Sequence, residues 1–255
     1  MSATAAIFRK EMRAYFCSPI AYVLWTCFVA LTGYFFYSGL LYYSMASMQA
    51  MQQPWGVTLN LQEMLMAPLM SNWSVMLMLI SPLLTMRLLS EEKRSGTIEL
   101  LLSYPLSDAS VVWGKFLAAL TMFALILLPT LAQVAILFWL GQPHLPAILA
   151  GYLGLIFMGG AFIALGLLAS ALTENQIVSG VLSFVALLML WVVGWSGNLV
   201  GGSLGEALKA LALGPHFEGF PKGLIDTADV AYFILFIGFF LFVTIRTLEA
   251  KRWKA

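Results

Sequence analysis

Charged side chains are scarce in this sequence of 255 residues, since Asp, Glu, Lys and Arg together make up only 10% of it. An ordinary soluble domain has about 25% charged residues. Hydrophobic residues make up 61%, and the mean hydropathy is +0.91. So few charges cannot cover a water-soluble globule, and the composition therefore predicts a polytopic membrane protein. A net charge of +1 argues against a nucleic-acid partner, because binding a phosphate backbone needs a strongly basic surface.

Cysteines are also few, and a complete nucleotide-binding motif is absent. Two cysteines, Cys17 and Cys27, are too few for a disulfide scaffold or a four-thiolate metal site. Gly114-Lys115 resembles the end of a phosphate-binding loop, but Ala109 stands where that motif needs a glycine. No HExxH pattern is present. We therefore expect no catalytic residue, no metal and no cofactor in this chain, and no enzyme activity of its own.

Six long apolar stretches predict an all-α polytopic membrane protein whose single transmembrane domain covers residues 1–255. Each stretch is long enough to cross about 30 Å of hydrocarbon. None has an ionised side chain away from its ends. The predicted spans are residues 20–43, 66–89, 111–140, 147–171, 177–199 and 229–247.

Residues 4–17 precede the first span and have the pattern of an amphipathic helix. Apolar residues recur near helical spacing, while Arg9, Lys10 and Arg13 fall largely on another face. A basic amphipathic helix of this kind lies in the headgroup plane of a bilayer. Ser18-Pro19 then ends it, because proline disfavours helix at the residue before it. We expect an interfacial elbow helix here.

Lysine and arginine are unevenly divided between the two sides of the predicted bundle. With six spans, both chain ends share one side, and that side carries 11 of the 13 basic residues. The other side has only Lys209 and Lys222. The positive-inside rule therefore predicts that both termini are cytoplasmic. Residues 88–114 then form the only sizeable inner segment, while residues 44–65 and 200–228 lie outside.

The 88–114 segment contains the pattern of a short helix over residues 97–104. Thr97 is a suitable N-cap, and Glu99 lies in the first turn, where a carboxylate favours the helix dipole. Pro105 ends the helix. Such a helix either inserts into a groove of another protein or packs on the inner rim of the bundle. Because the chain has neither intramembrane charge nor a nucleotide motif, we expect a partner at this face to supply the work.

The run EEKRSGTIELLLSYPLSDASVVWGKF resembles the cytoplasmic signature of ABC-2-type transporter permeases. That signature has paired acidic residues, a Gly-Thr-x-Glu-x-Leu helix, a proline, and Gly-Lys at the third span. The basic N-terminal helix is similar to the elbow of the same family. The residues that carry the resemblance are Glu91, Glu92, Arg94, Gly96, Thr97, Glu99, Leu101, Pro105, Gly114 and Lys115.

An outer run, PHFEGFPKGLIDTADVAYF, resembles the gliding-motility-type (GldF-like) subgroup of that family. The site residues that it suggests are His216, Phe217, Phe220, Gly223 and Asp226. His216 and the other histidine, His144, both fall in outer loops with prolines. We interpret both as surface or interface residues rather than metal ligands, because a metal site needs several partners.

The resemblance implies an ABC-2 (type V exporter-like) half-transporter in the bacterial inner membrane. A second permease half, identical or related, would pair with it, and two ABC ATP-binding subunits would hold the ATP and Mg. Helix 97–104 would be the coupling helix. Glu174, in the short inner turn at residues 173–175, would add a second contact. The subgroup also suggests an accessory membrane protein with a periplasmic domain.

The function expected from these features is that of the permease subunit of an ATP-driven exporter, coupled to its ATPase through residues 88–114. The alternative is a mechanotransmitter, in which ATP cycles move a periplasmic partner and nothing crosses the membrane. The substrate is not readable from the sequence. An intramembrane enzyme is disfavoured because paired polar catalytic groups are missing from the spans.

Overall fold

The structure, a computed structural model, describes residues 3–51, 60–97, 107–141 and 143–252, and these residues form helices and connecting turns without a strand. Four of the predicted spans, residues 20–43, 147–171, 177–199 and 229–247, each lie within one helix. The elements are α1 (Ala3–Cys17), α2 (Pro19–Met51), the π-helix η1 (Gln62–Met66), α3 (Ala67–Thr85), α4 (Ser90–Arg94), α6 (Asp108–Leu127), α7 (Thr130–Leu140), α8 (Leu145–Leu172), α9 (Gln176–Val200), α10 (Gly202–Leu211), α11 (Leu213–Phe217), the 3₁₀-helix η2 (Phe220–Lys222) and α12 (Thr227–Arg252).

Among the described residues, six candidate spans are long and apolar enough to cross a membrane. The spans built on α3 and α8 form the centre, with 72% and 78% of their most apolar windows buried. Glycines of α8 bring it close to its neighbours: a Cβ at Gly166 would lie 2.2 Å from Thr85 Oγ1 of α3, and one at Gly159 would lie 2.3 Å from the Phe123 ring of α6. Small residues permit such close approach in lipid.

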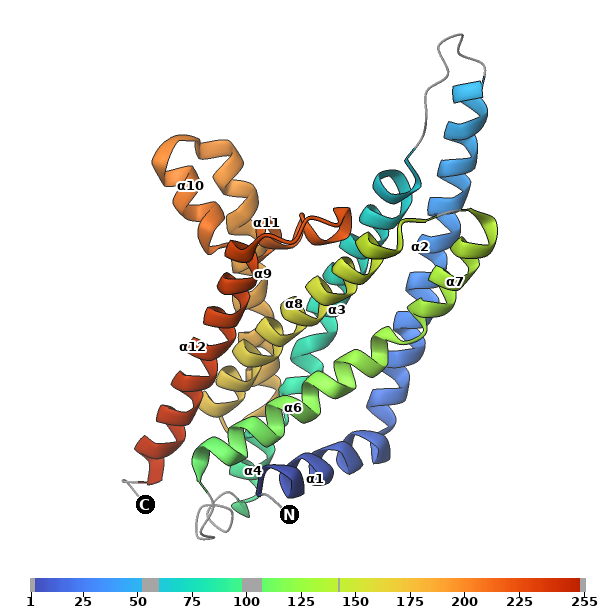
Figure 1. Cartoon of the computed structure of the whole chain (residues 1–255). Helices are drawn as coiled ribbons and strands as arrows, with labels where there is room; N and C mark the ends of the chain where they lie inside the picture. Colours follow the sequence, from blue (N-terminus) through green and yellow to red (C-terminus); the bar gives the residue numbers. More distant parts are fainter. Residues whose placement is uncertain (1–2, 52–59, 98–106, 142, 253–255) are drawn as a thin grey trace.

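The spans of α2, α9 and α12 lie at the periphery. Only 22%, 28% and 17% of their most apolar windows are buried. Apolar surface of this extent is unsuited to water and requires lipid or another apolar surface against it. Figure 1 shows α2 at one edge of the bundle and α12 at the opposite edge.

Two predicted spans are not single helices. Residues 111–140 are divided between α6 and α7 at Leu128-Pro129. Proline causes this break because it has no N–H and its ring clashes with the carbonyl four residues back. Residues 66–89 stop being α-helical at Thr85, where the chain turns into α4. The periodicity of apolar residues does not reveal either interruption, because both segments remain apolar.

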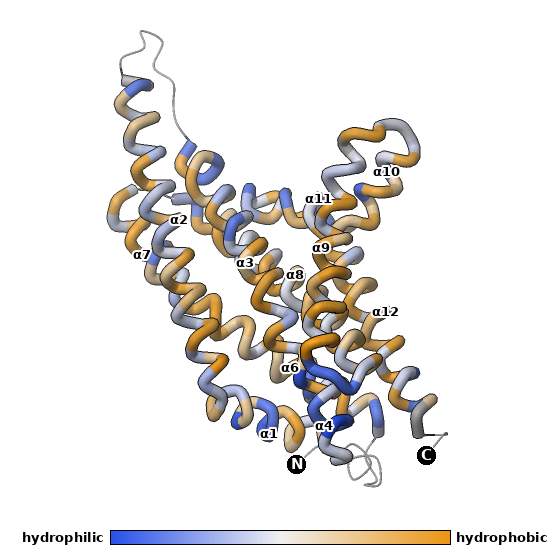
Figure 2. Tube along the Cα trace, turned by 180° about the vertical axis from the view of Figure 1, so that it is seen from behind, coloured by the Kyte–Doolittle hydropathy of each residue, from blue (hydrophilic) through white to orange (hydrophobic). Residues whose placement is uncertain are grey.

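The bundle has two distinct ends (Figure 1). Helices α1 and α4 and both termini lie at one end, which we call the terminal side. The tip of α2, together with η1, α10, α11 and η2, lies at the other, which we call the far side. Figure 2 shows hydrophilic residues gathered around α1 and α4, whereas the middle of the spans is mostly hydrophobic. The segregation fits a bundle that spans a bilayer.

Candidate functional site

The residues predicted to couple the chain to an ATPase begin in α4. Glu91 and Arg94 are exposed, whereas Glu92 is only 8% exposed. Gly96 follows with φ of +68°, and its N–H donates to the Lys93 carbonyl at 3.2 Å. This left-handed conformation is a common way to end a helix and costs glycine little. Helix α4 therefore turns one acidic side chain inwards and its neighbour outwards.

Most of the predicted coupling helix lies outside the described residues. Thr97 is the last residue before the gap; it is exposed, and its hydroxyl lies 2.8 Å from that of Ser95. The remainder of the 97–104 helix is outside the described residues, and so are Glu99, Leu101 and Pro105. Their role in coupling stays a prediction.

Lys115 of α6 is the centre of a buried group of charges next to α4. Its side chain is 1% exposed. The ammonium donates to Glu11 Oε1 at 2.7 Å and to the Leu88 carbonyl at 2.6 Å, and lies 2.9 Å from Glu92 Oε1. An ammonium has three N–H groups, and here each has an acceptor. A buried charge is costly unless it is paired in this way.

Lys10 of α1 completes the group. Its Nζ donates to Glu92 Oε1 at 2.6 Å and lies 3.7 Å from Glu11 Oε1. Burial acts to lower the pKa of Lys10, but the hydrogen bond and charge of Glu92, and then those of Glu11, outweigh it, so the pKa is raised above 10.5. Lys10, Glu11, Glu92 and Lys115 are hereafter the charge cluster. Two ammonium groups balance two carboxylates, and three helices contribute.

Close packing of α1 on α6 makes the cluster possible. A Cβ at Gly114 would lie 2.9 Å from Ile7 Cβ, so only glycine lets the two helices approach this closely. On α1 the buried residues are Ile7, Glu11 and Tyr15, spaced four apart on one face. The pair Gly114-Lys115 therefore provides the close approach and, one residue later, the ammonium that reaches Glu11.

Tyr15 fastens the same helix to the end of α3. Its hydroxyl donates to the Leu84 carbonyl at 2.8 Å, and the Arg87 guanidinium lies 4.9 Å from the centre of its ring. Burial raises the pKa of Tyr15, while the charge of Arg87 acts in the opposite direction. The hydroxyl therefore remains a donor at neutral pH. Together with the charge cluster, this contact fixes α1 across the terminal side.

Helix α4 is also attached to the end of α8. The Lys93 ammonium donates to the Ala171 carbonyl, where a cation suits the negative end of the helix dipole. The Ser170 hydroxyl accepts from the backbone N–H groups of Leu89 and Ser90, each at 3.0 Å. These contacts satisfy backbone groups in the turn between α3 and α4. Helix α4 is thus held by α1, α6 and α8.

Glu174, the other predicted coupling residue, is exposed in the turn between α8 and α9. Asn175 caps α9 by accepting from the Ile177 N–H at 2.9 Å, which fixes the turn. Because Lys93 contacts Ala171 near this turn, Glu174 lies on the terminal side close to α4. The structure thus places Glu174 on the same face as α4, which holds the described part of the other predicted coupling region.

Sequence reasoning did not select Lys10 or Glu11, and it noted Lys115 only as part of the family signature, without a role in coupling. A signal existed for Glu11, since it stands on the same face of α1 as Ile7 and Tyr15. The cluster has no net charge, and its carboxylates already have ammonium partners. Within the described residues, no group of three or more His, Cys, Asp or Glu is placed to hold a metal ion. The charge cluster therefore joins α1, α4 and α6 to one another through ion pairs.

On the far side, His216 links α11 to both neighbouring helices. Its Nδ1 lies 2.7 Å from Asp229 Oδ1, and its Nε2 lies 3.2 Å from the Ala210 carbonyl oxygen. Its ring stacks on Tyr232 with centroids 3.9 Å apart. Both polar partners are acceptors, so both contacts are hydrogen bonds only when both ring nitrogens carry a proton. We call His216, Asp229 and Tyr232 the histidine clamp.

Phe217 and Phe220 of the outer motif are buried against α8. Their exposed fractions are 2% and 0%. A Cβ at Gly154 would lie 2.6 Å from Phe220 Cβ, so a glycine is needed where this aromatic residue meets the helix. The two phenylalanines therefore anchor α11 and η2 to the centre of the bundle.

Gly223 and Asp226 shape the chain between η2 and α12. Gly223 has φ of +85°, and a Cβ there would lie 3.0 Å from Ala147 Cβ. Asp226 Oδ1 accepts from the Ala228 N–H at 2.9 Å at the start of α12. All five predicted residues of the outer motif lie in this region, and the positions described explain them as structural residues. Any further role for them stays a prediction.

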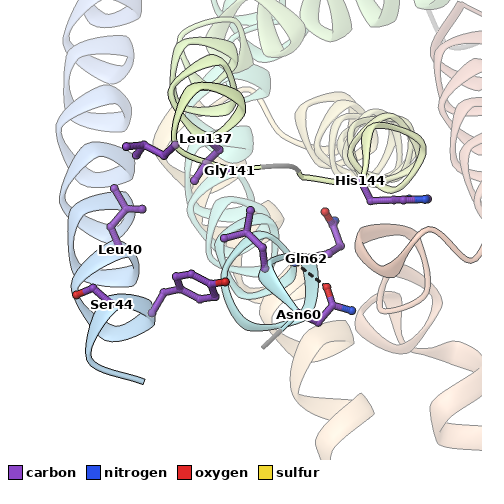
Figure 3. Close-up of a pocket in the computed structure, with 10 residues that line it drawn as sticks. Leu40, Ser44, Asn60, Gln62, Leu137, Gly141 and His144 are labelled. Carbon is purple, nitrogen blue, oxygen red and sulfur yellow. Dashed lines mark hydrogen bonds between the residues drawn. The ribbon is translucent and has the colours of Figure 1, made fainter. Parts of the chain in front are cut away.

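A cavity of about 560 Å³ opens on the far side between α2, η1 and α7 (Figure 3). Within it, Gln62 is 6% exposed; its Nε2 donates to the Pro221 carbonyl at 2.7 Å, and its Oε1 has no hydrogen-bond partner in the described part of the chain. The described lining has no carboxylate, Lys or Arg; it comprises Leu40, Tyr43, Ser44, Asn60, Leu61, Gln62, Leu137, Leu140, Gly141 and His144.

Six apolar helices, an amphipathic helix across one end and a charge cluster beneath them define a multi-pass integral membrane protein. The model of a family described as ABC-2 family transporter protein matches residues 5–249, and the chain belongs to this family. The protein is therefore a permease component of an ABC transporter, and proteins of this kind work with ATP-binding subunits. A search among curated proteins found no match.

Proposed function

We propose that this chain is the membrane-spanning half of an ATP-driven exporter in a bacterial inner membrane, with both termini in the cytoplasm. Two separate ATP-binding subunits, which hold ATP and Mg, dock on the terminal side. A second permease half, identical or related, completes the path. The segregation of basic residues to the terminal side supports this orientation.

The main support for this proposal is that α4 is attached to three other helices, α1, α6 and α8. This helix lies directly before the 98–106 segment, which contains most of the predicted coupling helix. Glu92 joins it to α1 and α6 through Lys10 and Lys115, and Lys93 joins it to α8. A displacement applied near residue 97 is therefore passed to three helices at once. A segment that transmits motion must be attached to several helices. A loop that only packs on the bundle has no need of so many attachments.

The far-side cavity supports an outward path. Its lining combines apolar side chains with amide, hydroxyl and imidazole groups, and such a mixture can hold a molecule that has both polar and apolar parts. The exposed faces of α2 and α9 offer apolar surface for the second permease half. Membership of the gliding-motility-type subgroup, and with it an accessory periplasmic protein, rests on the outer motif from His216 to Asp226.

The test compares two neighbouring glutamates in the purified complex of permease and ATP-binding subunits. Glu92→Gln removes one charge from the cluster, while Glu91→Gln removes the same charge from the surface of the same helix. We expect Glu92→Gln to reduce the ATPase activity that the permease adds to its partner by at least about tenfold, since tight coupling requires well-positioned contacts. Co-elution of the subunits should persist.

Glu91→Gln separates docking from transmission. As an exposed residue, Glu91 is expected to affect affinity for the ATP-binding subunit rather than the maximal stimulated rate. Full stimulation by Glu92→Gln, at unchanged affinity, would contradict transmission through the charge cluster. The absence of any ATP-binding subunit that binds and responds to the permease would contradict the proposed function as a whole.

The mechanotransmitter remains the second candidate, and the histidine clamp favours it. Through His216, the clamp ties α10 and α11 to α12, so motion of a long span is passed to elements on the far side. Leu204 and Leu211 of α10 are 66% and 57% exposed, which offers apolar surface to a partner. Transport in sealed vesicles distinguishes the two: the exporter moves a compound in step with ATP hydrolysis, and the mechanotransmitter does not.

A further inference from the structure

Two basic residues of α1 are not used by the charge cluster. Arg9 and Arg13 are exposed, and neither has an ion-pair partner among the described residues. They are four residues apart, so they lie on the same face of the helix. Phe16, 49% exposed, follows one turn after Arg13 on that face. Positive charge and an exposed aromatic ring are thus placed side by side.

These side chains line an open groove along α1. Its volume is about 670 Å³, and Ala6, Lys10 and Met12 complete its described lining. Lys10 points its ammonium at Glu92, so the two arginines are the cations left for a ligand. A guanidinium binds phosphate oxygens through paired hydrogen bonds. The groove therefore suits a phosphate ester.

A second, apolar cavity adjoins the first at Phe16. It measures about 90 Å³ and lies between the start of α2 and the end of α6. Figure 1 shows α6 rising from the terminal side towards α2, which it nears above the elbow. The Tyr22 hydroxyl donates to the Phe16 carbonyl at 3.0 Å and holds the junction in place. The lining residues are Phe16, Ala21, Tyr22, Trp25, Met122, Leu125, Ile126 and Leu128.

We propose that these two cavities bind one anionic phospholipid, with its phosphodiester on Arg9 and Arg13 and part of an acyl chain between α2 and α6. Phe16 lines both, so a bound molecule can extend from the arginines into the apolar cavity along one continuous surface. The described lining of the apolar cavity includes no charged side chain, which suits hydrocarbon.

A net negative charge is what selects the lipid. A zwitterionic headgroup carries its own cation, which two arginines repel, whereas an anionic headgroup such as glycerol phosphate does not. Basic residues at a membrane surface contribute about 1 kcal/mol each to binding of anionic lipid. A free phosphate ester would use only the arginines, while a phospholipid uses both cavities. Whether binding requires an acyl chain therefore distinguishes a phospholipid from a free phosphate ester.

The experiment counts lipids retained by the purified full chain in native mass spectrometry, with phosphatidylglycerol or phosphatidylcholine added to the detergent. We expect one phosphatidylglycerol to be retained in preference to phosphatidylcholine. Arg9→Gln with Arg13→Gln should weaken it about 30-fold, since two cations at about 1 kcal/mol each act and 1.4 kcal/mol is tenfold. The control, Lys209→Gln with Lys222→Gln, makes the same charge change on the far side and should leave retention unchanged.

A second variant tests the apolar cavity without disturbing the core. Leu128 is 51% exposed, so Leu128→Trp can fill the cavity from its open side. We expect it to weaken phosphatidylglycerol about tenfold, and glycerol 3-phosphate not to compete. Equal retention of both lipids, or loss of the lipid in the far-side control, would overturn the proposal. Full competition by glycerol 3-phosphate would also overturn it, because the site would then take a free anion.

Discussion

The terminal and far sides of this protein are built by different physical means. On the terminal side, side chains of opposite charge from α1, α4 and α6 meet around Lys115. On the far side, Phe217 and Phe220 pack against α8, and His216 makes one contact with a carboxylate and one with a backbone carbonyl. One side is held by mutually dependent ion pairs, and the other mainly by aromatic packing.

This difference predicts on which side a single substitution lowers the free energy of unfolding most. A buried ion that loses its partner retains its full desolvation cost. The loss of one ion therefore also turns its partners from stabilising into destabilising groups. Aromatic packing loses area by degrees, and neighbouring side chains adjust in part. We therefore expect the terminal side to respond steeply, and as a unit, to the loss of one group. The far side should respond in smaller and separable steps.

The largest effect is expected from Lys115→Met. The substitution leaves Glu11 and Glu92 without their buried cation, and the free energy of unfolding should fall by about 3–5 kcal/mol. Denaturant unfolding in mixed micelles measures the change. Lys222→Met, on the exposed far side, is the control and should change stability by less than about 0.5 kcal/mol.

Removing the stranded charges sharpens the same comparison. Adding Glu11→Gln and Glu92→Gln to Lys115→Met should recover a large part of the lost stability, because no buried unpaired ion then remains and Lys10, 59% exposed, keeps its contact with water. No recovery in this triple variant would show that the stability came from packing of the lysine stem instead.

A smaller effect is expected from Gly154→Ala on the far side. The new methyl group would lie 2.6 Å from Phe220 Cβ, and overpacking of this kind costs about 1–3 kcal/mol. Gly238→Ala in α12 is the matched control, since a Cβ there meets nothing within 4 Å. That control should be neutral or slightly stabilising, because alanine favours helix over glycine. Equal losses in both variants would contradict close packing at Phe220.

His216→Ala should cost about 0.5–1.5 kcal/mol, the usual net contribution of a hydrogen bond, because the side chain is only partly buried. The loss should be local, and hydrogen exchange of α10 and α11 should accelerate while that of α4 is unchanged. His144→Ala is the control, because His144 is exposed and its side chain makes no hydrogen bond within the described part. Faster exchange at α4 in His216→Ala would show that the two sides are not independent.

The smallest effect concerns pH and Lys10. The pKa of Lys10 is raised in the folded protein, so its contribution is fully present below pH 10.5 and is lost as the pH rises through the higher folded value. Its side chain is 59% exposed, so the contribution should be less than about 1 kcal/mol. The thermal midpoints of wild type and Lys10→Gln should differ by a constant amount up to pH 10 and converge above it.

Much of the fold could be predicted from the sequence, because crossing a bilayer imposes a length and a polarity on each helix. The six apolar stretches and the amphipathic segment before them were visible for that reason. The break at Pro129 was signalled by one residue, whereas the end of α3 at Thr85 was not. The latter depends on Ser170, which satisfies the turn from another helix 81 residues away.

The candidate site was less predictable, for a related reason. Family resemblance pointed to Glu91 and Glu92 alike, but only the structure separates the exposed residue from the buried one. The partners of Glu92 come from α1 and α6, and the contact of Lys115 with Glu11 joins residues 104 apart in sequence. Local periodicity carries no information about such pairs.

The break at Pro129 divides the third span into two helices, α6 and α7, that can change their angle to each other. Helix α6 is pinned at its base to the elbow by Lys115, while α7 meets α2 through Gln133, whose amide donates to the Thr32 hydroxyl at 3.1 Å. At the break, Leu128 N–H bonds the Leu125 carbonyl instead of continuing the regular ladder. If the terminal end of α6 tilts, the break at Pro129 can take up the bend. Helix α7, which lines the far-side cavity, then keeps its position.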